Sequence, residues 1–184
     1  MQKVEVTVEY PIVHVDDLGM PSVLLILKEK DKERICVLCI SHDVGQVISM
    51  ALEHFKTPRP LTHQLYVNSF KQLGFSIDNI VVYKLEEDVY HAKIVKTKGD
   101  GIYHEFDARP SDAVAVALLA GCPIFINEEF LQSNPEILNV IETLRKTKDF
   151  IRVPGHPAQE HSPMESEEDL RRMLNGLNKD STKH

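Results

Sequence analysis

The segment DARPSDAVAVALLAGCPIFI (107–126) carries the strongest fold signals in the sequence. Residues 111–120 are mostly Ala and Val on every side of a helical projection, and a helix that is apolar all around is buried all around. Gly121 is expected to end this helix, because glycine readily adopts the left-handed conformation of a helix C-terminus. Residues 123–126 then predict a short inner strand. We therefore expect the whole segment to lie in the core of the domain.

Apolar patterns on the N-terminal side of this segment predict the strands of a sheet. Residues 3–10 alternate between polar and apolar side chains, which is typical of a strand with one wet face. The apolar runs at 22–27 and 35–40 are separated by a charged stretch. They predict two central strands that are joined by a hairpin.

A three-stranded meander is predicted next. Residues 75–85 and 89–96 form its first two strands, and the third follows the turn signal Asp-Gly at 100–101. Asp-Gly favours a tight two-residue hairpin turn. Such a turn would place Lys96 opposite Glu105, so that unlike charges pair across the strands.

Three further helices are predicted around the sheet. The first runs over residues 41–55 and is capped by Ser41. The second is capped by Thr62 and reaches about residue 73, and a last one starts at Asn134-Pro135. The residues of the second helix that we expect to face inward are Leu65, Tyr66, Phe70 and Leu73.

The composition bounds the classes of protein that fit. A length of 184 residues favours one domain, which we assign to residues 1–152. Residues 153–184 change to a Pro- and His-containing linker and a short amphipathic helix, which either is a weakly held tail or docks on the domain or on a partner. The formal net charge of −7 lacks the broad basic field of a tight, sequence-independent duplex binder. No apolar run reaches the ~20 residues of a spanning helix, and the N-terminus has no signal-peptide core, so a cytoplasmic location without membrane contact is expected.

The three cysteines of the chain do not resemble a metal site or a disulfide framework. Cys36 and Cys39 are three residues apart on a predicted strand, so their side chains point to opposite faces. Zinc would need a second pair of ligands, and Cys122 stands alone. We expect reduced thiols with a structural role.

Two short segments place Arg-Pro directly before a predicted helix. They are PRPLTH (58–63) and DARPSDA (107–113), and the expected caps are Thr62 and Ser111. Proline forces the preceding Arg into an extended conformation, and the helix start beyond it offers free N–H groups and partial positive charge. An Arg beside such a start is suited to holding a phosphate or a carboxylate.

Acidic and imidazole groups accompany these two segments. Asp107 and Asp112 flank Arg109 and could hold it in place, cap the helix or bind a divalent metal through oxygen. Asp107 with Arg109 could equally form a structural ion pair. His63 stands out among the nine histidines because it lies in the first turn of a helix directly after an Arg-Pro segment.

With these motifs in view, the chain resembles the bifunctional nuclease domain family over about residues 3–132. The resemblance is carried by PRPLTH (58–63), DARPSDAVAVAL (107–118) and GCPIFINEEFL (121–131), in matching order and spacing. It implies an α/β (α+β-like) single domain with a mixed, largely antiparallel sheet flanked by helices, and a homo-oligomer. It also implies hydrolysis of both DNA and RNA. The residues of this chain at the motif positions are Arg59, Thr62, His63, Asp107, Arg109, Ser111 and Asp112.

The chain departs from the family pattern at two positions. Members commonly carry Glu where this chain has Val44 and Asp where it has Gln64. Two carboxylates are thus missing, and activity would be weak or absent if either of them held a metal or acted as a general base. Whether the chain is an enzyme stays open on the sequence alone.

Two functions from different classes fit these observations. In the leading one, a nuclease, Arg59 and Arg109 hold phosphate oxygens with help from Thr62 and Ser111. Asp107 and Asp112 bind Mg²⁺ or Mn²⁺ or orient water, and His63 is the general acid or base, since its ordinary pKa lies near neutrality. The alternative is a non-catalytic module that binds an anion, a nucleotide or another protein, which the acidic net charge and the two missing carboxylates favour.

Overall fold

The computed structural model describes residues 2–9, 11–15, 21–30, 32–98 and 103–147. The predicted linker and amphipathic helix at 153–184 therefore lie outside the described residues. The described chain forms one mixed sheet of nine strands with four α-helices and one short 3₁₀ helix, η1 (Glu128–Phe130). None of the described helices is long and apolar enough to cross a membrane.

Most strands follow the patterns of the sequence, whereas β2 and the polar, two-residue β9 were not predicted. Their bounds are β1 (Lys3–Val8), β2 (Ile12–Val15), β3 (Pro21–Glu29), β4 (Arg34–Ile40), β5 (Phe75–Glu86), β6 (Val89–Lys98), β7 (Tyr103–Ala108), β8 (Ile124–Asn127) and β9 (Gln132–Ser133). The order across the sheet is β7-β6-β5-β8-β1-β3-β4-β9, and β2 pairs with β3. All pairs are antiparallel except β5 with β8. The predicted mixed, largely antiparallel sheet is confirmed.

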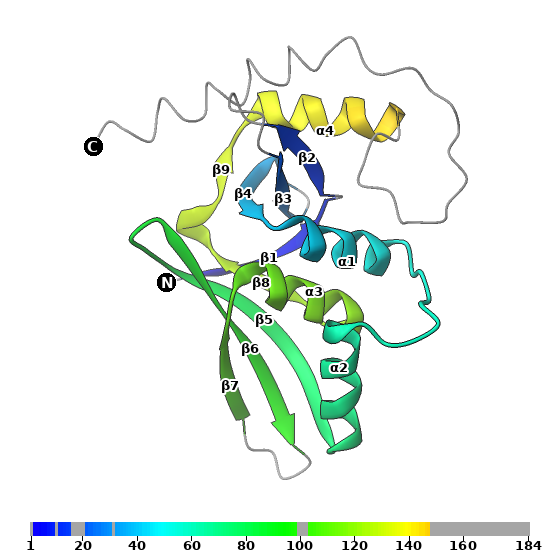
Figure 1. Ribbon diagram of the computed structural model, residues 1–184. Helices are drawn as coiled ribbons and strands as arrows, with labels where there is room; N and C mark the ends of the chain where they lie inside the picture. Colours follow the sequence, from blue (N-terminus) through cyan, green and yellow to red (C-terminus); the bar gives the residue numbers. More distant parts are fainter. Residues whose placement is uncertain (1, 10, 16–20, 31, 99–102, 148–184) are drawn as a thin grey trace.

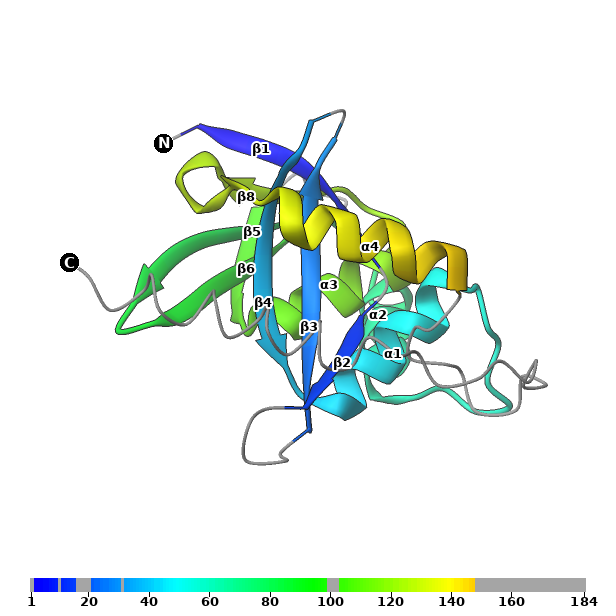
Figure 2. The same cartoon turned by 90° about the horizontal axis from the view of Figure 1, so that it is seen from above.

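The helices are divided between the two faces of the sheet. They are α1 (His42–Leu52), α2 (Thr62–Gln72), α3 (Pro110–Ala120) and α4 (Pro135–Thr147). The larger core cluster joins α1, α2 and α3 to one face (Figure 1). On the opposite face α4 crosses β3 and β4 (Figure 2), where Ile137 and Ile141 pack on Ile12, Ile26 and Ile35.

The helix predicted to be buried on every side is confirmed as α3. Residues 113–117 are all buried, and α3 contacts α1, α2, β5 and β6. Small Ala side chains let these neighbours approach closely, so that the helix fills the centre of the larger core. Gly121 ends it in the left-handed conformation with φ 72°, as expected.

The register of β6 with β7 differs from the expected one. Lys96 pairs with His104 and Glu105 pairs with Val95, so the predicted Lys96–Glu105 pair is wrong. Thr97 pairs with Tyr103, which leaves an odd number of residues between them, whereas a two-residue turn requires an even number. The Asp-Gly signal itself falls at 100–101, outside the described residues.

The inner face of α2 also differs in part from the prediction. Tyr66 and Phe70 pack toward the core together with Val67, whereas Leu65 and Leu73 are exposed. The reason is the rotation of the helix. The residues that face the sheet recur at i, i+3 and i+7 from His63, and Leu65 lies on another side. The first helix is shorter than predicted and ends at Leu52.

A network of ion pairs closes the far end of the β3–β4 hairpin. The buried carboxylate of Glu29 accepts hydrogen bonds from Arg34 at 2.6 Å and pairs with Lys32 at 2.8 Å. Arg34 also donates to Glu128 of η1 at 2.9 Å. The hydrogen bonds from Arg34 and Lys32 lower the pKa of Glu29 from 4.5 to about 2, against the effect of burial.

We expect Glu29→Gln to lower the free energy of unfolding by about 3 kcal/mol at neutral pH, because it leaves Arg34 without its buried counter-charge. A carboxyl with a depressed folded-state pKa stabilises fully above its unfolded value. The loss should therefore vanish as the pH falls from about 4.5 to about 2. Urea unfolding of both proteins across this range measures it. Glu86→Gln, at an exposed pair with Lys84, is the matched control and should leave the curve unchanged. A pH-independent difference would contradict the assignment.

Candidate functional site

Two helix starts that are far apart in the sequence meet in the fold. Asp112, in the first turn of α3, lies next to His63, in the first turn of α2. α2 begins two residues after Pro60 of the first Arg-Pro pair, α3 begins at Pro110 of the second, and the two helices contact each other along the core. The convergence expected from the repeated Arg-Pro motif is therefore present for His63, Arg109 and Asp112.

The carboxylate of Asp112 joins the other two groups. His63 Nε2 lies 3.0 Å from Asp112 Oδ1. Arg109 Nε donates to Oδ2 at 2.6 Å, and its Nη2 donates to Oδ1 at 3.1 Å. The guanidinium thus binds the carboxylate through two nitrogens, which fixes its plane and direction. We name His63, Arg109 and Asp112 the Arg–Asp–His cluster.

Charge and burial in the cluster favour an ionised Asp112. Its partial burial raises the pKa of the carboxyl, but hydrogen bonds from Arg109 and His63 outweigh burial and hold the pKa below its usual value. An ionised carboxylate only accepts hydrogen bonds, so Nε2 of His63 carries the proton between them. In the neutral imidazole, Nδ1 then keeps a free lone pair. The Arg109 side chain is 70 % exposed, so its remaining N–H donors face water.

The helix starts at the cluster differ from the predicted caps. The residue before the first turn is Leu61 in α2 and Arg109 in α3, both in extended conformation. Thr62 is therefore the first residue of its helix, and Ser111 is the second of its own. The restriction that Pro110 places on the preceding residue explains why Arg109 takes the cap position. Neither Leu61 nor Arg109 makes a side-chain cap hydrogen bond, and because Pro110 has no N–H, the free N–H groups of α3 begin at Ser111.

A third helix start, that of α1, lies beside the cluster. Asp43, in its first turn, interacts electrostatically with Arg109, and the pKa of Asp43 is lowered by the Ser41 hydroxyl first, then by backbone N–H groups and Arg109. Sequence reasoning missed Asp43, whose signal was only an acidic residue in a first turn. It considered instead the next position, where Val44 is buried in the core.

The other predicted site residues do not join the cluster. Asp107 is exposed on β7, and it follows Phe106, whose ring contacts Phe70 of α2. Successive strand residues point to opposite faces, so Asp107 points away from the helices. Arg59 and Thr62 are exposed, and the backbone carbonyl of Arg59 accepts a hydrogen bond from Thr57.

Ser111 and Gln64 also have positions that limit their roles. Ser111 is buried, so its side chain faces the core. The Gln64 amide donates to Asn68 at 2.9 Å on the same helix. Neither side chain is bonded to a member of the cluster.

The described residues do not fit the expected Mg²⁺ or Mn²⁺ site. Asp107 and Asp112 lie on different faces of the sheet, and both oxygens of Asp112 already accept hydrogen bonds. Within the described ranges, no group of three His, Cys, Asp or Glu side chains could hold a metal ion.

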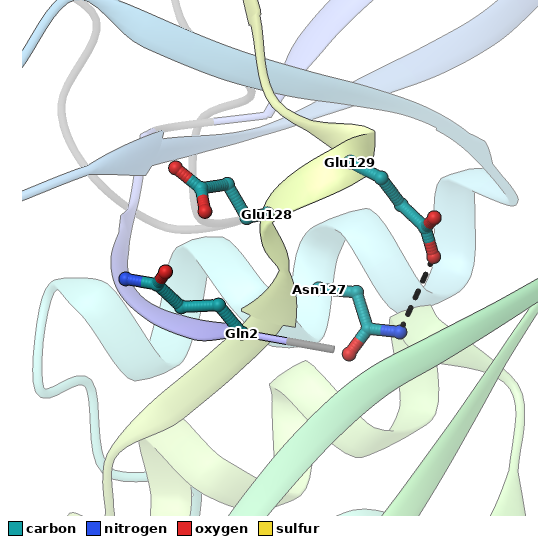
Figure 3. A pocket seen from close by; sticks show the side chains of 4 residues that line it. All are labelled: Gln2, Asn127, Glu128 and Glu129. Atoms are coloured by element: carbon teal, nitrogen blue, oxygen red, sulfur yellow. Dashed lines mark hydrogen bonds between the residues drawn. The ribbon is translucent and has the colours of Figure 1, made fainter.

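A pocket of about 350 Å³ lies elsewhere, at the junction of β8 and η1. It is lined by Gln2, Asn127, Glu128 and Glu129 (Figure 3). Its polar groups have partners within the protein: Asn127 donates to the carbonyl of Tyr83 at 2.7 Å and lies 3.5 Å from Glu129, and Glu128 pairs with Arg34. We therefore assign the pocket a structural role.

Comparison with known proteins supports the resemblance of the motifs. Residues 25–138 match the bifunctional nuclease domain. An uncharacterized protein of Mycobacterium tuberculosis is 31 % identical over 108 residues, which are 59 % of this chain and 63 % of that protein. Bifunctional nuclease 1 of Arabidopsis thaliana is 26 % identical over 133 residues, 71 % of this chain and 40 % of that protein. Bifunctional nuclease 1 of Oryza sativa subsp. japonica is 20 % identical over 117 residues, 62 % of this chain and 35 % of that protein.

The aligned region is less than two thirds of the length of each of these relatives. The match to the domain nevertheless spans more than half of the present chain, from β3 into α4, and it includes all three members of the Arg–Asp–His cluster. By its sequence, the chain belongs to the bifunctional nuclease domain family.

Proposed function

We propose that the protein is a nuclease that hydrolyses phosphodiester bonds of DNA and RNA at the Arg–Asp–His cluster. The observation that carries the proposal is the convergence of His63, Arg109 and Asp112 at two open helix starts. Membership in a family whose plant relatives are named bifunctional nucleases supports the reaction class. A homo-oligomeric state and a cytoplasmic location, as the sequence predicts, belong to the same proposal.

His63 acts as the general base in this scheme. Asp112 orients the ring through Nε2, and Nδ1 takes a proton from the water that attacks phosphorus. The P–O bond to the leaving sugar oxygen breaks, and that oxygen takes a proton from solvent. The same carboxylate stabilises the imidazolium that forms, as in other base–carboxylate pairs.

Arg109 and the helix starts bind the phosphate. Asp112 fixes one side of the guanidinium, and the outward N–H groups donate to phosphoryl oxygens. The first N–H groups of α2 and α3 add donors and partial positive charge where negative charge grows in the transition state. Arg59 and the Thr62 hydroxyl, both exposed, extend the phosphate contacts along a strand, and Ser111 contributes its backbone N–H rather than its buried side chain.

The same geometry also suits binding without catalysis. Asp112 is fully engaged by Arg109 and His63, and position 44 is a buried valine that offers no carboxylate. These two observations favour a module that binds an anion or a nucleotide. Thermal stabilisation by nucleotides or inorganic phosphate, without any cleavage of DNA or RNA, would establish this alternative.

Asp112→Ala tests the geometry of the cluster without any substrate. We expect a loss of about 1–2 kcal/mol in unfolding free energy, because Arg109 and His63 lose their shared acceptor. The NMR signal of the Nε2-bound proton of His63 should disappear in this variant. Asp107→Ala, which removes an exposed carboxylate on the other face of the sheet, should leave both readouts as in the wild type. Loss of the His63 signal in Asp107→Ala would contradict the placement.

Cleavage of labelled single-stranded DNA and RNA tests the reaction. His63→Ala should lower kcat/KM by roughly 10²–10⁴-fold, because a general base contributes about this much. Arg109→Ala should lower it by roughly 10²–10³-fold through lost charge stabilisation. Asp107→Ala distinguishes the sequence motif from the structure: the motif predicts that this variant loses activity, whereas the position of Asp107 away from the cluster predicts that it keeps activity. Wild-type rates in folded His63→Ala, measured with Mn²⁺ and with a chelator, would exclude the proposed site.

A further inference from the structure

A lysine ammonium is enclosed by aromatic rings near the C-terminal end of β6, where β5, β6 and β7 lie side by side in the sheet. Lys96 of β6 has an exposed fraction of 0 %. Its Nζ donates to Tyr66 Oη at 2.5 Å and lies 2.8 Å from the ring centroid of Phe70 and 4.2 Å from that of Phe106. Burial lowers the pKa of Lys96 to about 8.

This buried cation has no anionic partner among the described residues. In the part of the chain that the structure describes, no carboxylate lies within ion-pair distance of Lys96 Nζ, whereas the buried Glu29 has two basic partners. A buried charge is costly unless it is paired and hydrogen-bonded. Aromatic faces and one phenol compensate it only in part. A ligand that brings negative charge would complete the compensation.

The rings above Lys96 are themselves incompletely buried. We name Tyr66, Phe70, Phe75, His104 and Phe106 the aromatic strip, because neighbouring ring centroids lie 4.7–6.4 Å apart in a continuous series. β7 is the last strand of the sheet in the described order, so the strip reaches the edge of the domain. Phe106 is 38 % exposed, the largest exposed fraction in the strip. The exposed part of the Phe106 ring is therefore accessible to a ligand.

The strip continues directly into the Arg–Asp–His cluster. On α2, His63, Tyr66 and Phe70 follow each other at i, i+3 and i+7, which places them in one row along the inner face. On β7, Phe106 precedes Arg109 by three residues, which span about 10 Å of extended chain. A nucleotide next to a phosphate bound at Arg109 can therefore reach Phe106.

We propose that the aromatic strip is a subsite for an unpaired nucleobase next to the phosphate held at the Arg–Asp–His cluster, with Lys96 as the buried cation that the bound phosphodiester chain compensates. The inference rests on the proposed function, because it takes its occupant from the phosphate site. The base stacks on the exposed part of Phe106. Stacking on aromatic side chains accepts any base and requires that the base is not paired in a duplex.

The absence of tryptophan from the chain allows a direct test of stacking. Phe106→Trp introduces a single fluorophore at the proposed subsite, in a His63→Ala background that prevents cleavage during titration. A single-stranded oligodeoxynucleotide should quench its emission by stacking. Tyr103→Trp is the matched control: Tyr103 is 72 % exposed on the same strand, three residues before Phe106 and therefore on the opposite face. Its emission should not change. No quenching at position 106, or equal quenching at both positions, would overturn the proposal.

Binding measured by anisotropy separates the base from the phosphate. An oligonucleotide of the same length with abasic sites keeps the phosphodiester chain and lacks the bases. We expect it to bind about tenfold more weakly to the His63→Ala protein, and we expect Phe106→Ala to remove this difference. Equal affinity for both oligonucleotides, with intact binding, overturns the subsite and leaves the nuclease proposal in place. If His63→Ala abolishes cleavage and the intact and abasic oligonucleotides still bind with equal affinity, the base subsite is likewise overturned and the nuclease proposal stays in place.

Lys96→Met tests the role of the buried cation. Methionine keeps most of the volume and removes the unpaired charge, so the melting temperature should be retained or raised while affinity for the oligonucleotide falls about tenfold. A purely structural lysine predicts unchanged affinity in a variant that folds. Tyr103→Ala is the control for surface changes and should bind as the parent does. Unchanged affinity of Lys96→Met, with the melting temperature retained, would overturn the proposed role of the ammonium.

Discussion

The burial of α3 between α1, α2 and the sheet is the constraint on which the rest of the structure depends. Its Ala and Val side chains are small enough for three neighbours to pack against one helix. Because α3 is held from all sides, its first turn has a fixed position and direction. The charged residues Arg109 and Asp112 stand on that turn, so the core determines where the only polar part of the helix meets α1 and α2.

Because the first turn of α3 has a fixed position, a short sequence motif forms a cluster with a residue that is distant in the sequence. Pro110 forces Arg109 to be extended, and Arg109 then reaches over the first turn to Asp112. This contact alone is local and would form in many helices. The contact becomes part of a candidate site because the first turn of α2 lies beside it. His63 therefore contacts the Asp112 carboxylate, whose orientation Arg109 has already fixed.

The sequence predicted most of the fold because apolar periodicity reports burial, and burial decides where strands and helices lie. The prediction was wrong where the backbone geometry of a turn or the rotation of a helix about its axis determines the structure. The odd number of residues between Thr97 and Tyr103 moved the β6–β7 register, and the rotation of α2 placed Leu65 in water. At the site, the repeated Arg-Pro motif led to His63, Arg109 and Asp112. The same motif included Asp107, since a linear pattern does not show that strand neighbours point to opposite faces.

Lys96 illustrates a deeper limit of sequence reasoning. A lysine on a strand at the edge of a domain is expected to extend into water, and nothing adjacent to it in the sequence indicates an aromatic enclosure. Its rings come from α2 and β7, which are brought together only by the tertiary fold. A well-packed apolar residue at that position would make the protein more stable than an ammonium that has no carboxylate partner among the described residues. The turn that carries Arg109 and Asp112 follows β7, the strand that pairs with β6, so this cost in stability lies beside the Arg–Asp–His cluster.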